Sequence, residues 1–166
     1  MNIRRFLRHL FATRWTTRRR FPPRVLEGIE KAVRQAEARH AGEIRFVIET
    51  ALDLPELVQD LPSRQRALQV FSLLGVWDTE HNNGVLIYLL LADRVVEVVA
   101  DRGIAVNVAQ AEWDGICRAM EEHYRAGRFA EGCESGIRQV GELLARHFPR
   151  PRGAGENELP NQPVLL

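Results

Sequence analysis

The sequence is short of the features that would assign it to several well-known classes of protein. It has two cysteines, too few for the disulfide framework of a small secreted domain. Its longest wholly apolar run, residues 85–92, is far too short to cross a bilayer. It contains no GxGxxG, Walker, HExxH or GxSxG motif, so nothing indicates a dinucleotide, nucleoside triphosphate, zinc-protease or serine-hydrolase site.

The chain also lacks a strong net charge, but its charges are unevenly distributed. The 166 residues carry a formal charge of +1 in total. Residues 1–20 contain seven arginines and no acid, a charge of +7, and the remainder therefore carries −6. Because the mildly acidic remainder offers no matching basic patch, we expect no nucleic-acid partner.

The positions of the arginines also bear on localisation and domain organisation. An export signal needs an uninterrupted apolar stretch after its first charges, and Arg8, His9 and Arg14 interrupt it here. We therefore expect a cytoplasmic protein. We predict a basic amphipathic helical arm at residues 1–20, one domain at 21–148, and a flexible tail at 149–166, which holds four prolines and two glycines.

The arm has an apolar stripe at helical spacing. Steps of three and four residues separate its members, which are Ile3, Phe6, Leu7, Leu10, Phe11 and Trp15. Such a helix either docks on its own domain or lies on an anionic membrane surface, which it would contact through Arg4, Arg5, Arg8 and Arg14. We favour docking, because most amphipathic helices are core elements.

The rest of the chain reads as alternating helices and strands. We predict helices over residues 23–40, 63–74, 107–126 and 129–148, and strands over 43–49, 85–91 and 95–100. Residues 51–62 read as a loop with one helical turn, and a short edge strand is expected near 104–106. The strand at 85–91 is apolar throughout, which is typical of a strand buried on both faces. A mixed α/β sheet flanked by helices follows, with an antiparallel hairpin of the last two strands.

The densest polar segment, residues 77–84, directly precedes this buried strand. Asp78, Glu80 and Asn82 have the every-other-residue spacing of a calcium loop. Asn83 and Leu89, however, replace the glycine and the final glutamate of an EF-hand. The alternative is a polar turn built on Asn83 and the following glycine, and on this loop alone we favour the turn.

Antiparallel geometry places Asn83 and Asp101 at the same end of the hairpin. We therefore take four residues as candidate ligands of Ca²⁺ or Mg²⁺: Asp78, Asn82, Asn83 and Asp101. Arg102 and Glu80 are candidates for binding a ligand or phosphate, although an ion pair is the commoner fate of such residues. Asp93 and Arg94 lie at the hairpin tip, where we expect them only to form the turn. No catalytic residue is identified, and Cys117 and Cys133 are expected to be buried.

The segment Asn82-Asn83-Gly84 with its apolar strand, the Asp93-Arg94 tip and the Gly127-Arg128-Phe129 junction together resemble the TPM-domain family over residues 22–148. That family includes thylakoid-lumen acid phosphatases and photosystem II repair proteins. The resemblance implies a three-layer α/β/α sandwich, a divalent-ion site near the Asn-Asn-Gly loop and, for some members, phosphatase activity. Many members have a Gly-x-Gly-Leu-Glu-like turn after the second hairpin strand, and Asp101-Arg102-Gly103-Ile104-Ala105 here lacks the glutamate.

Three functions remain open at this point. The first is a TPM-domain module that binds a partner protein or small phosphate ester, with a divalent ion and without chemistry. The second is a metal-assisted phosphatase in which Asp78 and Asp101 hold the ion and Arg102 steadies the phosphate. The third is a peripheral membrane or assembly factor attached through the arm. We rank the first highest, because the sequence presents no evident nucleophile or general base.

Overall fold

Strand β2 (Gly84–Leu90) runs through the middle of the molecule, and all seven of its residues are buried. The computed structural model, which describes residues 3–150 and 157–166, builds a four-stranded sheet around it in the order β3-β2-β1-β4. Strand β1 (Glu43–Glu49) pairs with β2 in parallel, and β3 (Val95–Ala100) pairs with β2 antiparallel. The predicted mixed sheet with its hairpin is therefore confirmed.

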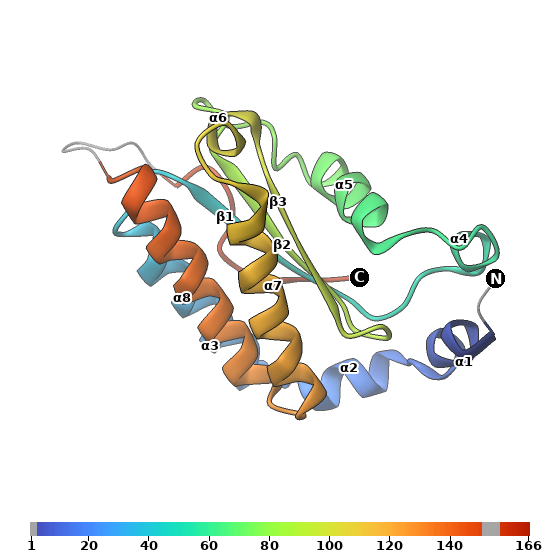
Figure 1. Ribbon diagram of the computed structural model, residues 1–166. Coiled ribbons are helices and arrows are strands. Elements are labelled where there is room, and N and C mark those ends of the chain that lie inside the picture. Colours follow the sequence, from blue (N-terminus) through green and yellow to red (C-terminus); the bar gives the residue numbers. More distant parts are fainter. Residues whose placement is uncertain (1–2, 151–156) are drawn as a thin grey trace.

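Helices cover both faces of the sheet and form three layers (Figure 1). One face packs against α3 (Pro23–Glu37), α7 (Gln110–Arg125) and α8 (Phe129–His147). The other face packs against α4 (Leu54–Val58) and α5 (Ser63–Leu73). Alternate residues of β2 enter each core: Ile87 and Leu89 on the first face, Leu86 and Tyr88 on the second. The α/β/α sandwich is thus confirmed.

The arm differs from the single helix that its apolar stripe predicts. It forms α1 (Ile3–Phe11) and α2 (Arg14–Arg20), and residues 1 and 2 lie outside the described residues. The side chain of Thr13 accepts a hydrogen bond from the Thr16 amide at 3.4 Å, and so caps a new helix. Both helices lie along the end of the sheet where the β2–β3 hairpin turns (Figure 1).

Two further predictions are wrong. Residues 104–106 do not form an edge strand, because Asp101 caps the short helix α6 (Arg102–Ala105) by accepting from the Arg102 amide at 2.7 Å. The tail at 149–166 is not flexible throughout, since Val164–Leu165 forms β4 and pairs in parallel with β1. Prolines are tolerated at a sheet edge, where the missing N–H costs no ladder bond, so their presence did not exclude a strand. The part of the predicted tail at 151–156 lies outside the described residues.

A charged cluster is buried between the sheet and α5. Glu49, which is 4% exposed at the end of β1, accepts hydrogen bonds from Arg66 Nη2 at 2.6 Å and Arg66 Nε at 3.0 Å. The Tyr88 hydroxyl donates to the same carboxylate. These bonds to Glu49 raise the pKa of Arg66, so the guanidinium stays charged. Each polar atom thus has a partner, as burial of a charge requires.

Helix α8 approaches its neighbours closely at glycines, Gly132 and Gly136 among them. A Cβ built on Gly132 would lie 2.6 Å from Tyr124 Cε1, whose ring stacks on Phe129. Gly115 on α7, by contrast, has nothing within 4 Å of such a Cβ.

These glycines make a matched pair for a stability measurement. We expect Gly132→Ala to lower the free energy of unfolding by about 1–3 kcal/mol, because the methyl group overlaps a ring that cannot move. Gly115→Ala should raise it by roughly 0.5–1 kcal/mol, because alanine loses less backbone entropy in a helix. Urea unfolding followed by circular dichroism measures both, and equal stability of the two variants would contradict the close approach.

A second prediction concerns Glu37 at the end of α3. Its side chain connects this helix with β1 and with the C-terminal tail. It accepts from the Ile44 amide at 2.7 Å and from Asn161 in the tail, and it is only 6% exposed. Burial raises the pKa of Glu37 from 4.5 to about 7. The folded state therefore holds this proton more tightly than the unfolded chain, and the resulting stability is full below pH 4.5 and lost as the pH rises through 7.

Glu37→Gln removes this titration. We therefore compare the free energy of unfolding of the variant with that of the unchanged protein. The difference, variant minus unchanged, should rise by up to about 3 kcal/mol between pH 4.5 and 7 and stay level outside that window. Burial lowers the pKa of His40 to about 4, an effect of opposite sign on stability that is common to both proteins and cancels in the difference. A difference that is flat across this range in chemical denaturation would contradict the assignment to Glu37.

Candidate functional site

The predicted site residues lie at the end of the sheet where β2 begins and β3 ends. Val85 lies opposite Ala100, and the Asp101 amide donates to the Gly84 carbonyl at 2.8 Å. The start of β1 lies at this end too, since the Glu43 amide donates to the Asn83 carbonyl at 3.0 Å. We call this end, formed by residues 41–42, 78–84 and 101–103, the loop end. It holds Asn82, Asn83, Asp101 and Arg102 on adjoining segments, as the hairpin geometry predicts.

Asn82 and the turn after β3 are joined directly. Arg102 Nε donates to Asn82 Oδ1 at 2.8 Å, and the Gly103 amide donates to the Asn82 carbonyl at 3.0 Å. A Cβ on Gly103 would lie 2.5 Å from the Asn82 carbonyl oxygen and 2.7 Å from that of His81. Only glycine permits this approach, so the two turns form one surface rich in carbonyl oxygen.

Among residues 3–150 and 157–166, nothing donates a hydrogen bond to one side-chain oxygen of Asn83 and one of Asp101. Asn83 is 8% exposed; its amide donates to Thr79 Oγ1 at 3.0 Å and its side chain donates to the Ala41 carbonyl. Its Oδ1 is buried and has no partner. Asp101 is 9% exposed and uses one oxygen to cap α6, while Oδ2 is buried without a partner. Buried acceptors rarely stay unpaired, so both oxygens suit a bound cation or water.

Asp78 and Glu80 occupy the outer part of the loop end. Both are exposed, and no described interaction links the Asp78 carboxylate to Asn83 or Asp101. The Glu80 amide donates to Glu158 Oε2 at 2.9 Å, a contact that the sequence did not reveal. Within residues 3–150 and 157–166, no three His, Cys, Asp or Glu side chains are grouped so that they could hold a metal ion. A cation here would rely on one buried carboxylate together with amide and carbonyl oxygens.

Neither cysteine is a nucleophile at neutral pH. Burial raises the pKa of Cys117 to about 12 and that of Cys133 to about 12. Both lie on helices α7 and α8, and Cys133 Sγ lies 3.3 Å from the Tyr124 hydroxyl in the core. Cys133 is buried as predicted, whereas Cys117 is only half-buried where it packs against the core.

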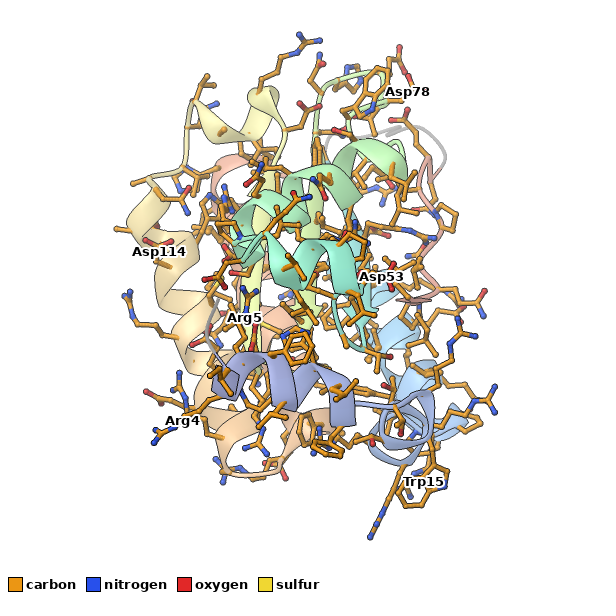
Figure 2. The ribbon with its side chains drawn as sticks, turned by 90° about the vertical axis from the view of Figure 1, so that its right-hand side faces the viewer. Arg4, Arg5, Trp15, Asp53, Asp78 and Asp114 are labelled. Carbon is orange, nitrogen blue, oxygen red and sulfur yellow. The ribbon has the colours of Figure 1, made fainter. Side chains whose placement is uncertain are left out.

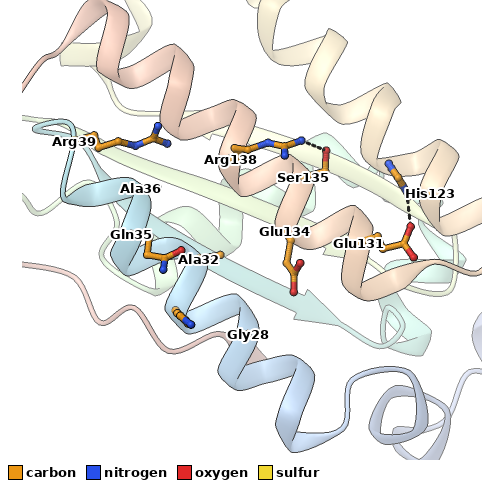
Figure 3. A pocket seen from close by; sticks show the side chains of 11 residues that line it. Gly28, Ala32, Gln35, Ala36, Arg39, His123, Glu131, Glu134, Ser135 and Arg138 are labelled. Carbon is orange, nitrogen blue, oxygen red and sulfur yellow. Dashed lines mark hydrogen bonds and ion pairs between the residues drawn. The ribbon is translucent and has the colours of Figure 1, made fainter.

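A groove of about 1010 Å³ lies elsewhere, between α3 and α8 (Figure 3). Charged side chains of both signs line it, but they are spread along its length rather than directed at one centre (Figure 3). His123 Nδ1 lies 3.9 Å from Glu131, and Arg138 donates to Ser135 Oγ at 3.3 Å. The charge pattern of this groove therefore points to no single ligand.

Sequence reasoning missed a buried polar cluster at the opposite end of the hairpin. Asp93 does more than form the turn: its Oδ2 accepts from Arg5 Nε at 2.8 Å and lies 3.1 Å from His9 Nε2. Arg8 Nη2 lies 3.2 Å from its other oxygen. Burial raises the pKa of Asp93, but the contacts with His9 and Arg5 outweigh it and hold the pKa below its usual value. His9, a lone imidazole within an arginine-rich helix, was the available signal.

The chain was compared with known families and structures. The model of the family described as "TPM domain" matches residues 21–143. The NMR structure of the BA42 protein from the psychrophilic bacterium Bizionia argentinensis is 31% identical, with a TM-score of 0.75 over 86% of this chain and 93% of that one. No curated protein matches the chain.

Two more distant structures share the fold alone. The N-terminal domain of a protein from P. gingivalis is 24% identical, with a TM-score of 0.56 over 71% of this chain and 74% of that one. The N-terminal domain of the cg2496 protein from Corynebacterium glutamicum is 14% identical, with a TM-score of 0.51 over 80% and 76% of the two chains.

Proposed function

The chain belongs to the TPM domain family, and from this premise we propose that its loop end is a binding module that takes up a divalent cation. The observation that carries the proposal is that two buried oxygens, Asn83 Oδ1 and Asp101 Oδ2, have no hydrogen-bond partner in the described part of the chain. Carboxylate and amide oxygens are the ligands that hard cations prefer. The nearby carbonyl of His81 offers a third oxygen beside Gly103.

The donor set favours Ca²⁺ over Mg²⁺. Calcium accepts irregular arrangements of neutral oxygens, whereas magnesium needs a near-ideal octahedron and keeps its water. Calcium affinity falls as the number of carboxylate ligands falls, and Asp101 supplies one buried carboxylate to this set. We therefore expect weak binding, with a dissociation constant on the order of 10⁻⁴–10⁻³ M.

A bound cation would make the loop end attractive to acidic ligands. Arg102 is exposed beside Asn82, and its guanidinium would act together with the cation on a carboxylate of a partner protein or on a small phosphate ester. In the alternative, a metal-assisted phosphatase, Asp78 and Asp101 would hold the ion and Arg102 would steady the phosphate. We favour binding, because the sequence presents no evident nucleophile or general base and the raised pKa values of both thiols keep them neutral.

Calorimetric titration with Ca²⁺ tests the cation site. The unchanged protein should bind Ca²⁺ more tightly than Mg²⁺, and Asp101→Asn should abolish binding, because it removes the buried charge but keeps the side chain's size and its capping oxygen. Asp78→Asn is the matched control, since it neutralises an exposed carboxylate of the same loop end and should bind as before. Binding lost in Asp78→Asn and retained in Asp101→Asn would overturn the assignment.

The choice between binding and catalysis is tested with p-nitrophenyl phosphate at saturating Ca²⁺ and, separately, Mg²⁺. We expect no release of p-nitrophenol above that of Asp101→Asn, because the sequence presents no evident nucleophile or general base to act on a bound ester. Turnover that disappears in both Asp101→Asn and Arg102→Ala would establish the phosphatase instead.

A further inference from the structure

The arm exposes an unusual amount of apolar surface. Five of its large apolar side chains are exposed, and we call them the arm patch: Ile3 (68%), Leu7 (45%), Leu10 (56%), Phe11 (74%) and Trp15 (68%). Of the predicted stripe, only Phe6 packs against the core. The stripe therefore does not dock as predicted, and Figure 2 shows Trp15 pointing away from the rest of the molecule. Several exposed large apolar side chains within one short segment of a folded domain are typical of an interaction site.

The arm is held by its other, polar face. The Leu52 amide donates to His9 Nδ1 at 3.0 Å. The Asp93 carboxylate contacts both Arg5 and His9 of the same helix, α1. In α2, the hydroxyls of Thr17 and Thr50 lie 2.8 Å apart in a buried contact. Turning the arm patch inward would leave these buried polar groups without partners, which is costly. The patch is thus kept outward by the way the arm docks.

Arginines surround the arm patch. Arg14, Arg18 and Arg19 are exposed, and the guanidinium of Arg19 lies 5.6 Å from the centre of the Trp15 ring. Arg8, which contacts Asp93, still has a side chain that is 54% exposed. Residues 3–20 contain no carboxylate to neutralise them.

Other elements add positive charge to the same end. Arg94 at the hairpin tip and Arg20 have no carboxylate within ion-pair distance among residues 3–150 and 157–166. Arg20 lies 4.8 Å over the Phe129 ring, and burial together with the nearby Arg94 lowers its pKa. Arg125 is paired with Glu121 and Arg128 with Glu131, so these two arginines add less net positive charge to this end. Arg20 and Arg94 are thus cations that an anionic group would stabilise.

Two adjoining grooves run beside the arm patch. One, of about 650 Å³, lies between α1 and the hairpin tip, and Leu7, Phe11, Arg20 and Arg94 are among its lining residues. The other, of about 620 Å³, is lined by Trp15, Arg20 and the start of α8. Both therefore combine an apolar wall with a guanidinium, and they share Arg20. This is the chemistry that receives a phosphate joined to an acyl chain.

We propose that this end of the molecule binds the surface of membranes rich in anionic phospholipid. The arm patch would enter the boundary between headgroups and acyl chains, and the surrounding arginines would contact lipid phosphates. The charge at this end selects the occupant: a second copy docked symmetrically would bring arginines against arginines, which like-charge repulsion disfavours. This inference concerns the end opposite the loop end, and it does not depend on the proposed cation site (Figure 2).

Vesicle sedimentation with the full chain tests the proposal. The protein should bind vesicles of equal parts phosphatidylglycerol and phosphatidylcholine, and bind phosphatidylcholine vesicles much less. Raising the salt should weaken binding, because ions screen charges over a Debye length of about 10 Å at 0.1 M. Phe11→Ser with Trp15→Ser should reduce the vesicle affinity by at least about tenfold, since two large apolar groups are lost. Arg94→Ala should reduce it by about fivefold.

The matched control is Leu73→Ser with Val106→Ser, which removes two similarly exposed side chains, 73% and 79%, outside the arm. It should bind vesicles like the unchanged protein, and thermal melts should show all variants folded. Equal binding by the Phe11/Trp15 variant and the control would overturn the proposal, as would equal binding to both kinds of vesicle. A dimer in sedimentation equilibrium without lipid that only the Phe11/Trp15 variant dissociates would identify the arm patch as a self-association face instead.

Discussion

The structure depends on one constraint, which is that β2 has no side that water can reach. All seven residues from Gly84 to Leu90 are buried, and their side chains alternate between two separate cores. Each core needs its own helices, and three layers follow. The antiparallel partner β3 then returns the chain to the point where β2 began. That return brings Asn83 and Asp101 together, so the candidate cation site is a by-product of pairing the most buried strand.

The same apolar frame explains why its few buried charges are so fully engaged. Glu49 ends β1 and Asp93 follows β2 at the same end of the sheet, and each carboxylate is bound by an arginine from a helix outside the sheet. Removing a carboxylate from water costs several kcal/mol unless it is paired, so each of them fixes its partner helix in place. Glu49 fixes α5 in this way and Asp93 fixes α1. At the loop end, Asp101 has no such cation, and this difference sets it apart from the other two.

Much of the fold could be predicted from local patterns. Three local patterns each predicted an element with a buried face, and the structure contains all three elements. They are the apolar run at 85–91, the alternation at 43–49 and the helical stripe from Phe129 to Phe148. Antiparallel geometry alone placed Asn83 beside Asp101. Membership of the family was visible in the Asn-Asn-Gly loop and the Gly127-Arg128-Phe129 junction.

What could not be predicted depends on contacts between distant parts of the chain. Strand β4 has two residues, too few for a periodic signal, and exists because β1 offers it an edge. The orientation of α1 follows from Asp93, 88 positions away from Arg5, and not from the helix's own apolar stripe. Which oxygen of Asp101 finds a donor likewise depends on the turn into α6, and no spacing in the sequence reveals it.

The hairpin keeps the two ends of the molecule apart. A strand of seven residues spans roughly 23 Å at about 3.3 Å per residue, and the loop end and the arm lie beyond its opposite ends. Solvent-exposed charges separated by that distance are largely screened from one another in a cell, where the Debye length is about 8 Å. A change of exposed charge at one end therefore alters the potential at the other only slightly. The hairpin thus acts as an electrostatic spacer, so that the two surfaces can be modified independently by evolution or by design.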